Sequence, residues 1–127
     1  MRKRTDFLVI GSGIAGLTFA LKAARYGKVA IVTKSILDDS NTRYAQGGIA
    51  AVIYEPDSYE KHIEDTLIAG DHLCNEEVVK MVVKEAPAQI RELIHWGTKF
   101  DKSSSGKYDL AREGGHSEHR ILHHKDN

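Results

Sequence analysis

Three glycines near the N-terminus have the spacing that holds the phosphates of a dinucleotide. Gly11, Gly13 and Gly16 lie in the segment GSGIAG, which fits the pattern G-x-G-x-x-G. The first glycine of this motif allows a tight turn, the second lets the backbone approach a pyrophosphate, and the third lets helix and strand pack closely. The phosphates then meet the free N–H groups and the positive dipole end of a helix. The motif is informative only between a strand and a helix.

The flanking sequence supplies that strand and that helix. Residues 7–10 are a continuous apolar run, which is typical of a parallel strand buried on both faces. An apolar helical pattern follows Gly16, and residues 29–32 (VAIV) supply a second strand. This β-α-β spacing predicts an α/β fold that begins with a Rossmann-like unit.

Two other interpretations of the N-terminus remain to be weighed. Basic residues 2–4 before an apolar stretch also fit a secretory signal, but Asp6 and the glycines interrupt that stretch. The second strand, moreover, continues the α/β pattern beyond any cleavage site. The other alternative is a glycine turn in an α/β protein that binds no dinucleotide.

Composition narrows the class of protein. A chain of 127 residues can bury one modest core, and its formal net charge of zero suggests neither nucleic acid nor a charged membrane as partner. No apolar run reaches the roughly 18 residues of a membrane helix. A single cysteine, Cys74, excludes an internal disulfide and suits a reducing compartment. We therefore expect a cytoplasmic protein.

The middle of the chain predicts a ligand loop followed by helices. A polar loop after Lys34 leaves the carboxyl end of a strand, where open α/β sheets bind ligands. The paired glycines at 47–48 indicate close approach of the backbone to another element or to a flat ligand. Asp57 or Ser58 is expected to cap a helix that ends near Gly70. Asn75 is expected to cap the next helix.

The rest of the chain predicts a further helix and a hairpin. Pro87 should end the helix capped by Asn75 and begin another, which ends at Gly97. Residues 100–111, with their central turn, predict a β-hairpin. A segment rich in glycine and histidine follows.

Four segments together resemble a known family. They are GSGIAGL at 11–17, SNTRYAQGGIAAV at 40–52, HIEDTLIAGDHL at 62–73 and REGGHSEHRILH at 112–123. They resemble the flavoprotein family of succinate dehydrogenases, fumarate reductases and L-aspartate oxidases, and the resemblance is closest to the oxidases. Members of the family are several times longer. The resemblance therefore implies that residues 1–127 are the N-terminal portion of an FAD-binding domain, with the capping domain and the remainder outside this chain.

The resemblance implies non-covalently bound FAD and names the residues that contact it. They are Ser12, Gly13, Ile14 and Ala15 at the pyrophosphate, Lys34 at the adenosine portion, and Asn41, Thr42, Arg43, Tyr44, Ala45, Gln46, Gly47 and Gly48 along the flavin. Gly11 and Gly16 complete the cofactor-binding turn. Two positions depart from related patterns. Lys34 stands where a ribose-binding acid is usual and could instead meet the 2′-phosphate of NADP, but family members also carry lysine here. Asn41 replaces the histidine that bonds FAD in respiratory succinate dehydrogenases.

The resemblance also implies a reaction. L-aspartate would be oxidised to iminoaspartate by hydride transfer to flavin N5, with oxygen or fumarate as electron acceptor. This reaction opens NAD biosynthesis, and quinolinate synthase takes the imine. Glu113 of REGGHS would bind the substrate ammonium through a charge-assisted hydrogen bond; alternatively, it is a solvated charge. The proton-abstracting arginine lies outside this chain, so we assign no catalytic residue here and expect residues 1–127 alone to be inactive.

Three other classes of protein remain as alternatives. A succinate dehydrogenase or fumarate reductase would share the flavin loop. A metal-binding module could use four clustered histidines: His116, His119, His123 and His124. No cysteine accompanies them and their spacing has no established zinc signature, so we predict no metal site. A nucleotide-binding module without catalysis is the third class.

Overall fold

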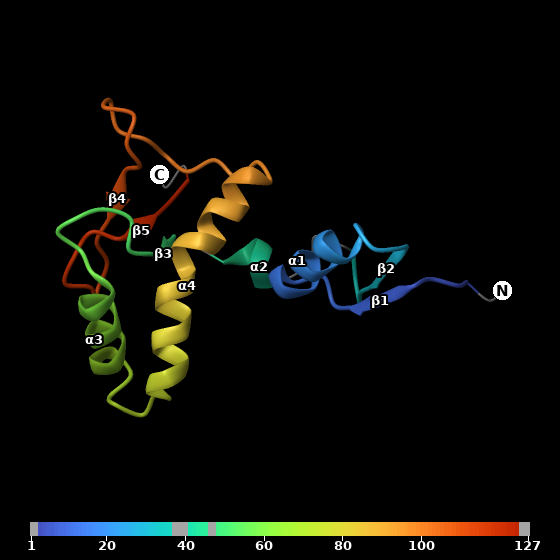
Figure 1. The fold of residues 1–127 in the computed structure, drawn as a ribbon, viewed down its shortest axis with the longest axis horizontal. Coiled ribbons are helices and arrows are strands. Elements are labelled where there is room, and N and C mark those ends of the chain that lie inside the picture. Colours follow the sequence, from blue (N-terminus) through green and yellow to red (C-terminus); the bar gives the residue numbers. More distant parts are fainter. Residues whose placement is uncertain (1–2, 37–40, 46–47, 125–127) are drawn as a thin grey trace. The chain divides into compact units, whose positions relative to one another are not determined.

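The computed structural model describes residues 3–36, 41–45 and 48–124. The chain forms two compact units, residues 1–46 and 47–127, each described here by itself (Figure 1). In chain order the elements are β1 (Phe7–Ile10), α1 (Ile14–Ala23), β2 (Val29–Val32), α2 (Asn41–Tyr44), β3 (Ile49–Ala50), α3 (Tyr59–Ala69), α4 (Glu76–His95), β4 (Leu110–Ala111) and β5 (Ile121–Leu122).

The first unit is a β-α-β arrangement, as predicted. β1 and β2 pair in parallel with Phe7 opposite Val29 and Ile10 opposite Val32, and α1 connects them. These elements form the blue-to-cyan part of Figure 1. Asp6 closes the far end of the unit, because its Oδ2 accepts a hydrogen bond of 2.8 Å from the backbone N–H of Lys28. The glycine turn lies at the opposite end of the unit, directly after the carboxyl end of β1.

The expected burial of β1 on both faces is wrong. Val9 is 7% exposed, but Leu8 is 59% and Ile10 is 84% exposed. Successive strand side chains point to opposite faces. α1 covers only the face that carries Val9, since an added Cβ on Gly16 of α1 would lie 3.3 Å from Val9 Cγ1. A two-stranded sheet with one helix leaves its other face open among the described residues.

The second unit combines an antiparallel sheet with two helices. The strand order is β3-β5-β4, with Ile49 opposite Leu122 and Leu110 also opposite Leu122. α3 and α4 lie side by side and are joined by a short loop (Figure 1). The buried centre is Ala51, Ile90 and Leu122, and partly buried apolar residues surround it: Ile53, Ala86, Leu93, Ile94, Phe100, Tyr108 and Leu110.

Both predicted helix starts in this unit are confirmed. Ser58 Oγ accepts from the N–H of Lys61 at 3.2 Å, and Asn75 Oδ1 accepts from the N–H of Val78 at 3.2 Å. Each bond satisfies one of the free N–H groups of a first helical turn. α3 ends at Gly70, which is its C-terminal cap.

The predicted helix break at Pro87 is wrong, because α4 runs without interruption from Glu76 to His95. A proline inside a helix removes one backbone hydrogen bond and crowds the preceding turn. Here Val83, Pro87 and Ile90 recur on one helical face and are all buried. Their packing offsets the local cost. Trp96 is the cap, and Gly97 follows it at φ +106°, a conformation that favours glycine.

The predicted hairpin at 100–111 is confirmed over residues 101–109, whose outer backbone bond runs from Asp109 N to Asp101 O at 3.0 Å. Lys102 and Tyr108 form an isolated antiparallel bridge, and Ser103 N donates to Lys107 O at 2.9 Å. Beyond the bridge, Leu110 and Ala111 pair with β5 instead of continuing the hairpin. No helix in the described part of the chain has the length and apolarity needed to cross a bilayer.

Candidate functional site

Two glycines of the N-terminal motif are required by the fold itself. Gly11 has φ +107°, a left-handed conformation that other residues rarely adopt. A Cβ on Gly16 would lie 2.4 Å from the carbonyl oxygen of Gly11, so α1 could not approach the turn so closely. Both glycines therefore do what the sequence predicted for them.

Gly13 differs because no contact among the described residues requires it to be glycine. The nearest atom to an added Cβ would be Thr42 Oγ1 at an ordinary 3.8 Å. Gly13 is the N-cap of α1 and has no side chain to cap the helix; Thr42 takes up one N–H, that of Ile14, and the first turn carries no acidic residue. Such a helix start offers N–H groups and the positive end of the dipole to an anion. The space in front of Gly13 thus fits a phosphate group.

The surroundings of the turn bring together several of the predicted residues. Ile14 N donates to Thr42 Oγ1 at 3.1 Å, which places Thr42 at the start of α1. The buried Ser12 shares a hydrogen bond of 3.1 Å with Thr33 through the two hydroxyl groups. Lys34, the next residue, is exposed. The structure therefore joins the glycine turn, Thr42 and the end of β2 in one region of the first unit.

The predicted flavin loop is only partly described. Its first residues form the short helix α2 rather than an open loop, and Ala45 after it is exposed. The side chain of Asn41, and Gln46 and Gly47 altogether, lie outside the described residues. At Gly48 the close neighbour is protein, since a Cβ there would lie 2.3 Å from Leu122 O. Packing on β5 therefore requires this glycine.

Glu113 lies on the loop of residues 112–119, which connects β4 to β5 in the second unit. Its side chain is exposed, and its carbonyl accepts from His116 N at 3.3 Å, which closes a turn. Gly115 in this turn has φ +81°. The carboxylate is available to a ligand, as the prediction of an ammonium partner requires.

A buried ionic cluster, which the sequence did not predict, lies at the base of this loop. Arg120 is fully buried and its guanidinium grips Asp57 with two bonds, Nε to Oδ2 at 2.9 Å and Nη2 to Oδ1 at 2.7 Å. Its Nη1 donates to Asp65 Oδ2 at 2.5 Å. Burial disfavours the charge on Arg120, but the two carboxylates raise its pKa above the usual value. Asp65 follows His62 by three positions on α3, a spacing that could have revealed a shared polar face.

Two histidines flank this cluster. The rings of His62 and His116 lie 5.8 Å apart, and His116 Nδ1 lies 3.3 Å from Arg120 Nη1. Burial, followed by the charges of Arg120 and His116, lowers the pKa of His62. His62 is therefore neutral at neutral pH. No group of three histidine, cysteine or acidic side chains within the described ranges is placed to hold a metal ion.

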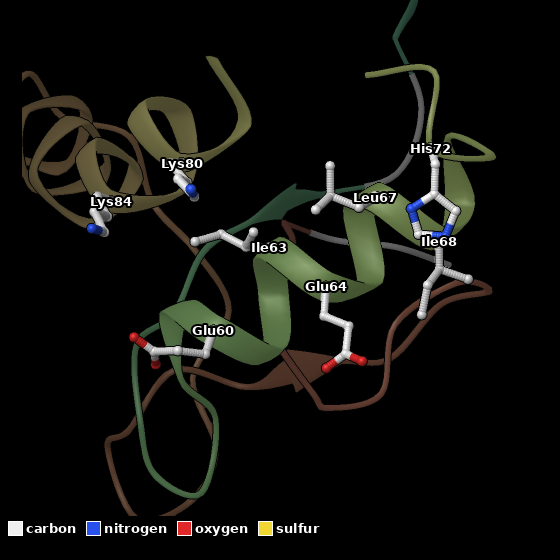
Figure 2. Close-up of a pocket in the computed structure, with 8 residues that line it drawn as sticks. All are labelled: Glu60, Ile63, Glu64, Leu67, Ile68, His72, Lys80 and Lys84. Atoms are coloured by element: carbon white, nitrogen blue, oxygen red, sulfur yellow. The ribbon is translucent and has the colours of Figure 1, made fainter. Parts of the chain in front are cut away.

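A groove between α3 and α4 is separate from these residues. It encloses about 530 Å³ and is lined by three apolar residues, four charged ones and a histidine: Ile63, Leu67, Ile68, Glu60, Glu64, Lys80, Lys84 and His72. Figure 2 shows the side chains of α3 and the two lysines of α4 around it. None of the predicted site residues lines the groove, so we assign it no ligand.

A parallel β-α-β unit whose glycine turn leaves the N-terminus of a helix open to an anion defines a dinucleotide-binding fold. Comparison with known proteins agrees: residues 6–127 match the FAD binding domain family, and the chain belongs to that family. FAD is thus its cofactor.

The most informative relatives are L-aspartate oxidases. The chain is 52% identical over 124 residues to the chloroplastic L-aspartate oxidase of Oryza sativa subsp. japonica, covering 98% of this chain and 19% of the rice protein. It is 49% identical over 126 residues to the L-aspartate oxidase of Vibrio cholerae, covering 95% of this chain and 24% of that protein. The chain spans about a fifth of the length of these relatives.

Solved structures of two related enzymes share the fold. Sdh1 of Mycobacterium smegmatis in complex with UQ1 superposes with a TM-score of 0.84 at 36% identity, covering 94% of this chain and 20% of that one. A quinol–fumarate reductase with menaquinol molecules gives a TM-score of 0.85 at 34% identity, covering 94% and 21%. The predicted α/β fold of an FAD-binding domain is thereby confirmed.

Proposed function

We propose that this chain is the N-terminal part of an enzyme that oxidises L-aspartate to iminoaspartate with FAD. The observation that carries the proposal is the identity of about half of all residues to L-aspartate oxidases across nearly the whole chain. Each unit by itself holds a feature that the proposal uses: the first has the N-terminus of α1, which can receive an anion, and the second has the exposed carboxylate of Glu113. The capping domain and the base belong to the remainder of that enzyme.

The residues of the glycine turn would hold the pyrophosphate of FAD. Gly13 leaves room for it, and the N-terminus of α1 supplies N–H groups and a favourable dipole. Lys34 supplies positive charge beyond the end of β2, and Thr42 lies beside Ile14 at the helix start. When bound, the flavin supplies the two-electron acceptor that the oxidation needs. The chain's own contribution is to bind and orient the cofactor.

FAD should be held without a covalent bond, because Asn41 carries an amide where the linking histidine of the dehydrogenases would stand. Acid precipitation of the full-length protein checks this directly. We expect the yellow colour to stay in the supernatant. Flavin that remains in the pellet would show that the attachment is covalent and that the role given to Asn41 is wrong.

The alternative function is succinate or fumarate chemistry, which the structural similarity to Sdh1 and fumarate reductase favours. The role of Glu113 distinguishes aspartate oxidation from this alternative. Aspartate carries an ammonium group that succinate and fumarate lack. An exposed carboxylate at this position attracts an ammonium and repels a dianion. We therefore propose that Glu113 selects the amino acid.

Glu113→Gln in the full-length enzyme tests this selection. The substitution keeps the shape of the side chain and removes its charge. Losing a hydrogen bond to a charged group costs about 1.5–3 kcal/mol, so kcat/KM for aspartate should fall roughly ten- to a hundred-fold. Fumarate reduction, measured on the same preparation, should be unchanged or improved. Equal losses of both activities would mean that Glu113 only supports its loop. An unchanged aspartate activity would mean that Glu113 is a solvated surface charge that does not bind the substrate.

The partners follow from the chemistry of the product. Oxygen or fumarate would take up the electrons, and iminoaspartate, which hydrolyses in water, must be consumed promptly. We propose quinolinate synthase as that consumer. Because quinolinate has three more carbon atoms than iminoaspartate, the test mixes the two enzymes with aspartate and the three-carbon co-substrate of the synthase, and measures quinolinate. Location in the cytoplasm stays a prediction, since some relatives are chloroplastic.

A further inference from the structure

The loop that carries Glu113 needs an anchor. It spans residues 112–119 and is closed at its base by Arg120 N donating to Ala111 O at 3.1 Å. Two successive glycines, one of them at φ +81°, follow Glu113 directly. Glycine lowers the barrier to alternative backbone conformations and raises the entropy lost on ordering. A carboxylate placed before such a pair is not fixed by its own backbone.

Asp65 of α3 provides the anchor. Its Oδ2 accepts from the backbone N–H of Ser117 at 2.8 Å, from Ser117 Oγ at 2.8 Å and from Arg120 Nη1 at 2.5 Å. The Asp65 side chain is only 14% exposed. Ser117 follows the turn that His116 N closes on Glu113 O, so the anchored residue and Glu113 belong to one short turn.

The anchor is itself fixed from two directions. Asp65 lies in the middle of α3, and Arg120 is clamped to Asp57 just before the N-terminal cap of the same helix. Partial burial would raise the pKa of Asp65, but the hydrogen bonds from Ser117 and Arg120 outweigh it and lower that pKa. The carboxylate is therefore ionised at neutral pH, when it can accept all three bonds.

We propose that Asp65 is a positioning residue that fixes the 112–117 turn so that Glu113 meets the substrate ammonium. The inference rests on the proposed function, since it assumes that Glu113 reads the amine. It assigns Asp65 no contact with substrate. Its effect on aspartate oxidation must therefore pass through Glu113, which makes the proposal testable apart from a general structural role.

A double-mutant cycle in the full-length enzyme tests this dependence. Asp65→Asn keeps the size but weakens the anchor, so kcat/KM for aspartate should fall roughly ten-fold, mainly through KM. In the Glu113→Gln background the same change should cost less than about two-fold, because the group it positions has been lost. Losses of equal factor in both backgrounds, or no loss in the parent, would overturn the proposal.

A matched control lies one residue earlier on the same helix. Glu64 is exposed and lines the groove between α3 and α4 (Figure 2). Glu64→Gln makes the same change of charge, and the activity should stay within about two-fold of the parent. Should Asp65→Asn fold poorly, Ser117→Ala removes the hydroxyl bond to Asp65 and the long bond of 3.5 Å from Arg120 Nη2, and keeps the backbone bond to Asp65. Ser117→Ala should lower kcat/KM for aspartate less than Asp65→Asn does, and its loss should again be smaller in the Glu113→Gln background. Losses of equal factor in both backgrounds would again contradict the proposal.

Amide hydrogen exchange gives a readout that does not depend on activity. In Asp65→Asn, peptides covering 112–119 should exchange faster while those of α4 keep the parental rate. A uniform rise over the second unit would mean that Asp65 acts on stability alone and would overturn the positioning role. If the parent enzyme failed to oxidise aspartate, the proposed function would fall, whereas the local exchange result would still test the anchor.

Discussion

Replacing Gly13 with valine will abolish FAD binding while the helical content of the protein stays near that of the parent. Among the residues that the structure describes, an added Cβ at this position meets only Thr42 Oγ1, at 3.8 Å, so these surroundings tolerate a small side chain. A branched side chain fills the space in front of the α1 N-terminus where the pyrophosphate must approach. Flavin absorbance after desalting and far-UV circular dichroism on the same sample measure the two effects.

Gly16→Val is the informative comparison for that result. Its Cβ would lie 2.4 Å from the carbonyl oxygen of Gly11, which is backbone and cannot move aside cheaply. We expect this variant to lose both FAD and the packing of the first unit. If Gly13→Val instead binds FAD as tightly as the parent, the phosphates do not lie at Gly13, and the assignment of the turn is wrong.

Arg120→Met will destabilise the second unit by about 3–5 kcal/mol, because it leaves the carboxylates of Asp57 and Asp65 without their buried cation. Methionine replaces the aliphatic part of the arginine side chain but supplies neither the guanidinium charge nor a hydrogen-bond donor. Urea unfolding of the 127-residue chain, followed by the fluorescence of Trp96, its one tryptophan, measures the loss.

Lys61→Met is the control for this effect. Lys61 Nζ pairs with Glu118 Oε1 at 2.6 Å, but the two side chains are 43% and 24% exposed. Partly solvated pairs of this kind contribute about 1 kcal/mol or less. Similar losses in Lys61→Met and Arg120→Met would contradict the view that burial makes the Arg120 cluster critical.

The first unit could be predicted from the sequence because its signals are local. The apolar run before Gly11, the motif and the second strand follow one another within the first 32 residues, and each reports its own conformation. The helix starts at Ser58 and Asn75 could be predicted equally well, since a capping side chain contacts a residue only three positions later. Thr42 was assigned to the cofactor site only through the family resemblance, because its hydrogen bond to Ile14 spans 28 residues and leaves no local signal.

The second unit was harder because its decisive contacts are distant in sequence. Arg120 meets Asp57 and Asp65 across 63 and 55 residues, and only the β3-β5-β4 sheet brings them together. The helix break at Pro87 was predicted wrongly for a related reason. Proline locally disfavours a helix, but its burial with Val83 and Ile90 outweighs this preference. Burial of β1 was overestimated because the pattern of a strand does not tell how many layers cover it.

The account's central claim is that this chain belongs to an enzyme whose flavin is reduced by L-aspartate. The most direct measurement is the visible spectrum of the purified full-length protein, without oxygen, before and after L-aspartate is added. We predict that the oxidised flavin bands bleach with L-aspartate, not with succinate at the same concentration, and return when air is admitted. Bands that persist with aspartate, or that bleach with succinate alone, would contradict the account.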